Sequence, residues 1–507
     1  MVSSFLIVLL GATSSLLLSI IFERLLKPAP AWNRPLSSWG LHIGLWCVLY
    51  ALLVLLLGRP WFAAASLSFL MLLFVIISNV KHNVLNEPLV YQDYDYVIDI
   101  IKHPRLYIPF FGWFKTITET LFYIIILAAG LYLETPPSDR FMLSGQLGAI
   151  LLLFIIGLLL LFTASRKPLD VGHDPVSDIA TFGFLACFWH YGVKNRQYPT
   201  VNSPFNNLSE KPNSGRYQNG KLPHLVAVQS ESFFDARCLY PHTRQDILAS
   251  FDQLKSTSML YGKLSVPAWG ANTVRTEFSF LSGIQNETLG VHHFNPYRAI
   301  ASGWHVSSLA LYLKTLGYHT ICIHPYPASF YQRKTVYPCL GFDEFIDIAA
   351  FNKKEHFGPY ISDSAVADKV SEAIQTYDKP LFLFVITMEN HGPLHLEKID
   401  DSELDDLYTK RPPKACRDLS IYLRHLRNAD AMIAKITHSL ASASRPASLC
   451  WFGDHVPIMP SVYKALGAPT GETDFILWHS DDALSQPQAK LSIANLATSW
   501  LSLLKLI

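Results

Sequence analysis

Three polar positions that follow apolar runs carry side chains able to bind a metal ion. Asp454 and His455 follow one run and Glu231 follows another, so together they offer two carboxylates and one imidazole. Mixed oxygen and nitrogen ligation of this kind suits Mn²⁺, Mg²⁺ or Zn²⁺. A Gly-Asp-His turn alone is more often structural, and it is the glutamate at a second strand end that favours a metal site.

Thr273 could complete this ligand shell and act as a nucleophile. A free threonine hydroxyl is a poor nucleophile, but a divalent ion that lowers the pKa of bound water from 15.7 to about 7 polarises an alcohol in the same way. Thr273 stands at the start of a predicted helix, where unpaired N–H groups favour an anion. The alternative is that Asn272 or Thr273 serves only as a helix cap, which does not exclude catalysis.

Four more side chains are candidates for the same site, namely His324, Tyr331, Arg333 and His391. His391 could donate a proton to a leaving alkoxide or hydrogen-bond the phosphate. Arg333 could place its guanidinium fork on the phosphate oxygens. Taken singly, each of the four is more often structural or solvated. The adjacent pair His292-His293 is left out because neighbouring residues rarely aim at one ion.

The elements that must position these residues form an alternating pattern after about residue 221. Strands are predicted at 222–229, 258–264, 319–323, 381–387, 448–452 and 474–478. Helices are predicted at 272–281, 307–316, 362–376, 418–439 and 491–504. This alternation indicates an α/β domain with a largely parallel central sheet. The polar clusters follow the carboxyl ends of the strands, where open α/β sheets bind ligands, so distant motifs can meet in one crevice.

The part of the chain before about residue 165 is dominated by long apolar runs. A membrane-spanning helix needs about 20 apolar residues, and five candidate spans are predicted at 2–22, 38–58, 61–78, 116–133 and 141–163. The first span has no Lys or Arg before it, which favours an anchor over a cleaved signal. Three regions follow: a five-helix transmembrane domain at 1–165, a linker and juxtamembrane segment at 166–220, and a catalytic domain at 221–507. An interfacial segment is expected near 90–108.

Composition excludes some classes of function. The net charge is +1 and no basic stripe appears, which argues against a nucleic-acid binder. The seven cysteines are an odd number and none forms a C-x-x-C pair, so neither a zinc ribbon nor a thioredoxin site is indicated.

These motifs together resemble the lipoteichoic acid synthase and phosphoglycerol transferase family of the alkaline phosphatase/sulfatase superfamily. The residues that carry the resemblance are Glu231-Ser232-Phe233, Asn272-Thr273 with Glu277-Phe278, His324 through Arg333, Asn390-His391 and Gly453-Asp454-His455. Their order matches, and so does a five-span membrane domain before an extracytoplasmic, sulfatase-like catalytic domain.

The resemblance implies a threonine nucleophile and one bound divalent ion. It places metal ligands at Glu231, Thr273, Asp454 and His455, with Mn²⁺ favoured over Mg²⁺ or Zn²⁺. It also implies substrate contacts at His324, Tyr331, Arg333 and His391. Lipoteichoic acid synthases carry tryptophan where this chain has Tyr331, and Trp269, Val274 and Arg275 also depart from the Gram-positive pattern.

The implied reaction moves phosphoglycerol from phosphatidylglycerol to a glycan or glycolipid acceptor. Thr273 displaces diacylglycerol and forms a phosphoglycerol-threonine intermediate, from which an acceptor hydroxyl takes the group. The membrane domain would hold the lipid donor near the bilayer surface. The differences from the Gram-positive pattern around Thr273 favour a Gram-negative inner membrane with the catalytic domain in the periplasm. An extracellular catalytic domain is the alternative.

Three rival functions and one conflict over membrane orientation stand beside this interpretation. A phosphoethanolamine transferase would use the same nucleophile and metal, but such enzymes are richer in disulfides. A non-catalytic protein on a decayed enzyme fold would have lost a ligand, whereas all four positions are filled. A true sulfatase needs a Cys or Ser that becomes formylglycine, which Thr273 cannot. Counting positive charges in the loops favours the opposite membrane orientation from the one the family implies.

Overall fold

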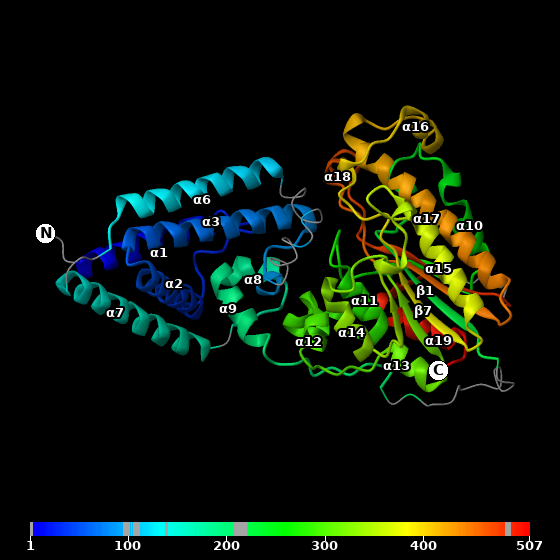
Figure 1. Ribbon diagram of the computed structural model, residues 1–507, viewed down its shortest axis with the longest axis horizontal. Helices are drawn as coiled ribbons and strands as arrows, with labels where there is room; N and C mark the ends of the chain where they lie inside the picture. The colour runs from blue at the N-terminus through cyan, green and yellow to red at the C-terminus, as the bar shows by residue number, and fades with distance from the viewer. Residues whose placement is uncertain are drawn as a thin grey trace. The chain divides into compact units, whose positions relative to one another are not determined.

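The computed structural model divides the chain into two compact units, Met1–Gln197 and Tyr198–Ile507 (Figure 1). It describes residues 4–94, 102, 104, 112–136, 140–167, 169–206, 208, 221–481 and 488–507. Most of the interfacial segment predicted near 90–108 lies outside the described residues. Each unit has its own hydrophobic core.

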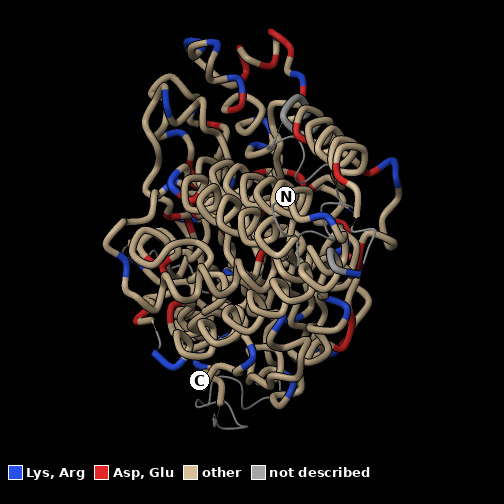
Figure 2. The backbone as a smooth tube through the Cα atoms, turned by 90° about the vertical axis from the view of Figure 1, so that its left-hand side faces the viewer, with Lys and Arg blue, Asp and Glu red and all other residues tan. Residues whose placement is uncertain are grey.

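The first unit contains long helices at all five positions where spans are predicted. They are α1 (Ser4–Glu23), α2 (Leu36–Leu57), α3 (Pro60–Leu85), α6 (Trp113–Leu133) and α7 (Arg140–Ser165). In the described residues, four helices are long and apolar enough to cross a membrane, whereas the apolar part of α6, Ile117–Leu133, is shorter. The helices seen end-on around the N-terminus carry few charged positions (Figure 2).

Two short helices fall inside the segment predicted as a linker. They are α8 (Pro175–Phe182) and α9 (Phe184–Lys194), and Asp174 caps α8 by accepting from backbone N–H groups. Phe182, Phe184 and Leu185 belong to the same buried cluster as side chains of the long helices. The apolar stretch at 180–191, too short to span a membrane, therefore packs into the core of the first unit.

The second unit is built on an eight-stranded sheet with the order β10-β2-β9-β8-β1-β7-β3-β4. The strands are β1 (His224–Ser230), β2 (Leu260–Ser265), β3 (His319–Ile323), β4 (Glu344–Ile346), β7 (Leu381–Ile386), β8 (Ala447–Gly453), β9 (Thr473–His479) and β10 (Gln488–Ser492). Of these strands, β9 alone runs antiparallel to its neighbours, so the predicted, largely parallel sheet is confirmed. All six predicted strands are present, and β4 and β10 are additional.

Helices cover both faces of this sheet, which explains why its central strands are apolar along their whole length. Val226 and Val228 of β1 belong to one buried cluster, and Leu225 and Ala227 belong to the other. The first cluster includes side chains of α10 (Ala249–Ser256), α15 (Asp363–Thr376) and α17 (Arg417–Ala441). The second includes side chains of α11 (Thr273–Ser282), α12 (Pro296–Ala301), α13 (Leu309–Thr315), α14 (Arg333–Cys339) and α19 (Ile493–Leu503).

Smaller elements of this unit include α16 (Asp401–Leu407), α18 (Pro460–Leu466) and a separate hairpin of β5 (His356–Phe357) with β6 (Tyr360–Ile361).

Candidate metal centre

Glu231, Asp454 and His455 meet at the carboxyl edge of the sheet. One donor atom from each lies within 4.8 Å of the others, and all three residues are buried. The sheet explains the meeting, because β1 and β8 are adjacent and parallel with Ser230 opposite Gly453, so the residues after each strand leave side by side. Gly453 permits this close approach, since a Cβ there would collide with the carbonyl oxygen of Phe233.

Hydrogen bonds turn one atom of Asp454 and one of His455 toward a common point. Asp454 Oδ1 accepts the N–H groups of Ser232 at 2.8 Å and His455 at 2.9 Å, which leaves Oδ2. His455 Nδ1 lies 3.2 Å from the Val456 carbonyl oxygen, which can only accept, so Nδ1 carries the hydrogen and Nε2 presents a lone pair. Among the described residues, Oδ2 and Nε2 have no hydrogen-bond partner.

The electrostatics of this cluster favour a cation. His455 Nε2 lies 3.4 Å from Asp454 Oδ2 and 3.7 Å from Glu231 Oε1. Burial and then the neighbouring Asp454 carboxylate raise the pKa of Glu231 to about 8. Buried lone-pair atoms without a partner cost free energy, and so do two carboxylates in close contact, unless a positive charge lies between them. The residues present therefore fit a divalent metal ion.

Thr273 lies at the first position of α11, beside the loop that carries Asp454. Its predecessor Asn272 has a left-handed backbone with φ 65°, and Thr273 itself is half-buried. One turn along the same helix, the Thr276 hydroxyl donates to the Asp454 carbonyl oxygen at 2.8 Å. Because residues three apart share one helix face, Thr273 is on the side of α11 that faces this loop.

Arg333 is held by a buried carboxylate that sequence reasoning did not assign. Its Nε and Nη2 donate to the two oxygens of Glu277 at 3.1 and 2.5 Å. The hydroxyls of Tyr297 and Tyr337 also donate to Glu277, at 2.8 and 2.6 Å. Arg333 Nη1 has no hydrogen-bond partner among the described residues. One edge of the guanidinium is thus occupied, and Nη1 is the donor left for a ligand.

The charge of Arg333 also reaches the metal cluster and His324. It is among the charges that act on both Glu231 and His324. Burial and then the charge of Arg333 lower the pKa of His324 well below its usual value. His324 Nδ1 donates to the Ile386 carbonyl at 3.2 Å, so the neutral ring presents a lone pair at Nε2.

His391 and Tyr331 lie in the same neighbourhood. Burial lowers the pKa of His391, and among the charges that oppose this is Asp454. His391 Nδ1 donates to the Gly392 carbonyl at 2.7 Å, so Nε2 of the neutral ring is a proton acceptor. The centroid of the Tyr331 ring lies 5.1 Å from the guanidinium carbon of Arg333. The backbone of Tyr331 is left-handed, with φ 53°.

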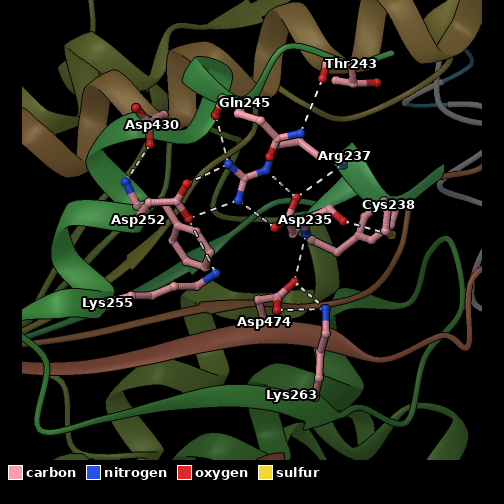
Figure 3. A network of polar contacts seen from close by, with 12 residues as sticks. Asp235, Arg237, Cys238, Thr243, Gln245, Asp252, Lys255, Lys263, Asp430 and Asp474 are labelled. Carbon is pink, nitrogen blue, oxygen red and sulfur yellow. Dashed lines mark hydrogen bonds and ion pairs between the residues drawn. The ribbon is translucent and has the colours of Figure 1, made fainter. Parts of the chain in front are cut away.

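The loop that carries Glu231 is fastened at its far end by an ionic network (Figure 3). The Asp235 N–H donates to Asp474 Oδ2 of β9 at 2.8 Å, and the Asp235 carboxylate pairs with Arg237 at 2.7 Å. Arg237 reaches Asp252 of α10 as well, at 2.6 Å. Lys263 of β2 pairs with Asp474 at 2.8 Å. The loop after β1 is therefore tied to β9 and α10, and the pair of Lys263 with Asp474 joins β9 to β2.

Comparisons with known proteins agree with this fold. The family model described as Sulfatase matches residues 223–506. The capsular polysaccharide biosynthesis protein RkpI of Rhizobium meliloti is 26% identical over 449 residues, which are 83% of this chain and 77% of that protein.

Two solved structures align with this chain, and the first of them shares its fold. The lipooligosaccharide phosphoethanolamine transferase A of Neisseria meningitidis aligns with a TM-score of 0.58 and 14% identity, over 99% of this chain and 96% of that one. The phosphoglycerol transferase GacH of Streptococcus pyogenes aligns with a TM-score of 0.46 and 18% identity, over 60% of this chain and 84% of that one.

Proposed function

Because this chain belongs to the sulfatase family, we propose that it is a membrane-bound, metal-dependent phosphoglycerol transferase. It would move phosphoglycerol from phosphatidylglycerol to a glycan or glycolipid acceptor on the outer side of the membrane. The name of the Rhizobium relative, a capsular polysaccharide biosynthesis protein, supports an envelope glycan as acceptor. The proposed catalytic region is 221–507, preceded by a membrane domain at 1–165 and a connecting segment at 166–220.

One observation supports this chemistry above the others. Donor atoms of Glu231, Asp454 and His455 converge within 4.8 Å, and the first turn of α11, which carries Thr273, contacts the same loop through Thr276. A structural cluster would satisfy its own polar atoms, whereas Asp454 Oδ2 and His455 Nε2 have no partner among the described residues.

The proposed metal ligands are Glu231, Asp454 and His455, with the Thr273 hydroxyl as the fourth. When bound, a divalent ion such as Mn²⁺ would lower the pKa of that hydroxyl and offset the crowded negative charge. The amino-terminal end of α11, where a helix favours an anion, and Arg333 Nη1 would contact the phosphate oxygens of the donor.

Proton transfer falls to His391 in this scheme. In the first step the deprotonated Thr273 Oγ attacks phosphorus, the bond to the diacylglycerol oxygen breaks, and protonated His391 gives its proton to that oxygen. In the second step neutral His391 takes the proton of the acceptor hydroxyl, whose oxygen attacks phosphorus and releases Thr273 in its deprotonated form. His391 is then protonated again, as the first step requires. The neutral ring with its lone pair at Nε2 is the form that the second step needs.

Phosphoethanolamine transfer is the second candidate, and a buried carboxylate favours it. Both oxygens of Asp363 lack a hydrogen-bond partner among the described residues, and burial, then the charges of Glu389 and Glu231, raise the pKa of this group. A carboxylate without a cationic partner could pair with an ammonium head group. Against it, all seven cysteines of the chain are unpaired, whereas the resemblance links phosphoethanolamine transferases with disulfides.

A donor competition separates the two candidates. The purified full-length chain with Mn²⁺ is given vesicles that contain both phosphatidylglycerol and phosphatidylethanolamine, and the release of diacylglycerol from each lipid is followed by mass. We expect phosphatidylglycerol to be consumed and D363N to leave this preference unchanged. Consumption of the ethanolamine lipid that disappears in D363N would select the second candidate, and consumption of neither lipid would contradict both.

A further inference from the structure

Ser232 contacts each of the three side chains proposed to bind the metal. Its hydroxyl donates to Glu231 Oε1 at 2.8 Å and lies 3.3 Å from His455 Nδ1. Its backbone N–H donates to Asp454 Oδ1 at 2.8 Å. Ser232 is buried, with 3% of its surface exposed, so solvent does not compete for these contacts.

The hydrogen atoms of this group can be assigned from their partners. The Ser232 hydroxyl has one hydrogen, which the Glu231 carboxylate accepts. The hydrogen on His455 Nδ1 is therefore shared between the Val456 carbonyl and the Ser232 oxygen. A chain of donors runs from His455 through Ser232 to Glu231, and it fixes the tautomer in which His455 Nε2 can bind a cation.

The backbone of Ser232 is in a conformation that favours glycine. Its φ is 54°, in the left-handed region where a side chain is disfavoured. The Tyr422 hydroxyl of α17 donates to the Ser232 carbonyl at 2.7 Å and helps to hold this conformation. Glycine adopts this left-handed conformation without strain. The presence of serine therefore indicates that its hydroxyl contacts with Glu231 and His455 have a role. Strained residues of this kind persist where surrounding contacts over-determine them, often at functional sites.

We propose that Ser232 is the positioning residue of the metal site and sets the orientation of Glu231 and His455 before an ion binds. This inference rests on the proposed function only in that the site binds a divalent cation. Asp454 is held by the backbone N–H of residue 232, which any non-proline residue supplies. Loss of the hydroxyl should therefore weaken metal binding without removing it.

The test measures Mn²⁺ binding to the full-length chain in detergent, after removal of bound metal with a chelator. Calorimetric titration with Mn²⁺ gives the affinity, and the Tm without added metal gives the stability. We expect S232A and S232G to bind Mn²⁺ roughly 10–100-fold more weakly than the wild type. We also expect the metal-free Tm of S232G to equal or exceed that of the wild type, because glycine relieves the left-handed backbone.

The opposite changes in stability and affinity separate positioning from a purely structural role. S258A is the matched control, because the Ser258 hydroxyl is also buried and donates to the Lys255 carbonyl at 2.8 Å, on the amino-terminal side of β2. S258A should bind Mn²⁺ as the wild type does. The loss of an orienting partner typically weakens metal affinity at least tenfold. The proposal is therefore overturned if the Mn²⁺ affinities of S232A and S232G lie within about twofold of the wild-type affinity.

Failure of the proposed function gives a different result. If the Mn²⁺ affinities are ordered as expected but neither lipid is consumed, Ser232 keeps its role and the transferase proposal is wrong. A wild-type chain that binds no Mn²⁺ would overturn the inference on Ser232 together with the metal dependence.

Discussion

Among single residues, the buried pair of Glu277 and Arg333 shows how one carboxylate orients a guanidinium. Glu277 occupies Nε and Nη2 of Arg333, so one donor, Nη1, is left for the phosphate contact that we propose. Tyr297 and Tyr337 hold the carboxylate in turn. The sequence indicated Arg333 but did not predict that Glu277 holds it, because a glutamate four residues after Thr273 could equally well be exposed to solvent.

The first prediction concerns this pair. E277Q should lose about 3–5 kcal/mol of stability, because it leaves the charge of Arg333 buried without its partner. The double variant E277Q/R333M should regain much of that stability but stay inactive, since the phosphate contact is gone. Denaturant unfolding and diacylglycerol release measure the two effects. An active double variant would show that Arg333 does not act on the substrate.

At the scale of elements, the sheet supplies most of the site by bringing strand ends together. Glu231 follows β1 and Asp454 follows β8, and the paired strands set them side by side. The strand-end pattern made this meeting predictable from the sequence. The reversed direction of β9 and the short strands β4 and β10 were not predictable, because they depend on pairing between distant segments and β10 has no apolar run.

The loop that carries His391 is held to α17 by a charged histidine. His425 Nδ1 lies 3.0 Å from Glu389, and Nε2 lies 3.1 Å from Glu397. Burial opposes the charged ring, but the hydrogen bonds to Glu389 and Glu397 outweigh it and raise the pKa of His425 above its usual value. Such contacts between elements leave no trace in local sequence, so this clamp could not be inferred from the chain alone.

The second prediction follows from that raised pKa. The folded protein holds the proton more tightly than the unfolded chain, so this stabilisation is complete below the unfolded value of about 6.5. It is lost as the pH rises through the higher, folded pKa. The Tm of the wild type should therefore fall over this range relative to that of H425Q, measured on metal-free protein. If the Tm values of the two proteins change with pH in parallel, the charge of His425 does not stabilise the fold.

At the scale of the whole molecule, the two units have separate cores. The described buried clusters of the second unit contain only residues after Gln197, and that of the first contains only residues before Tyr198. In the first unit, Glu23 of α1 pairs with Arg34 at 2.6 Å and accepts the Phe184 N–H of α9 at 2.7 Å. The long apolar runs predicted the helices. The contacts of Glu23 were not predictable, because they join residues that are far apart in the sequence.

The third prediction uses this separation. A fragment of residues 198–507 should fold and bind Mn²⁺ as the full chain does, because its core needs no residue of the first unit. Its turnover of phosphatidylglycerol in vesicles should be lower, since it lacks the helices that keep the site at the bilayer. Circular dichroism, Mn²⁺ titration and diacylglycerol release compare the two proteins. Equal turnover would show that the membrane unit does not assist the donor.

We propose that Thr273 is the covalent nucleophile, and mass spectrometry of its peptide tests this role. The full-length chain is incubated with Mn²⁺ and phosphatidylglycerol without acceptor, digested, and compared with T273A and with the control S258A. We predict that the peptide containing Thr273 gains the mass of phosphoglycerol in the wild type and S258A, and that no peptide gains it in T273A. An adduct that still accumulates in T273A would show that another residue is the nucleophile.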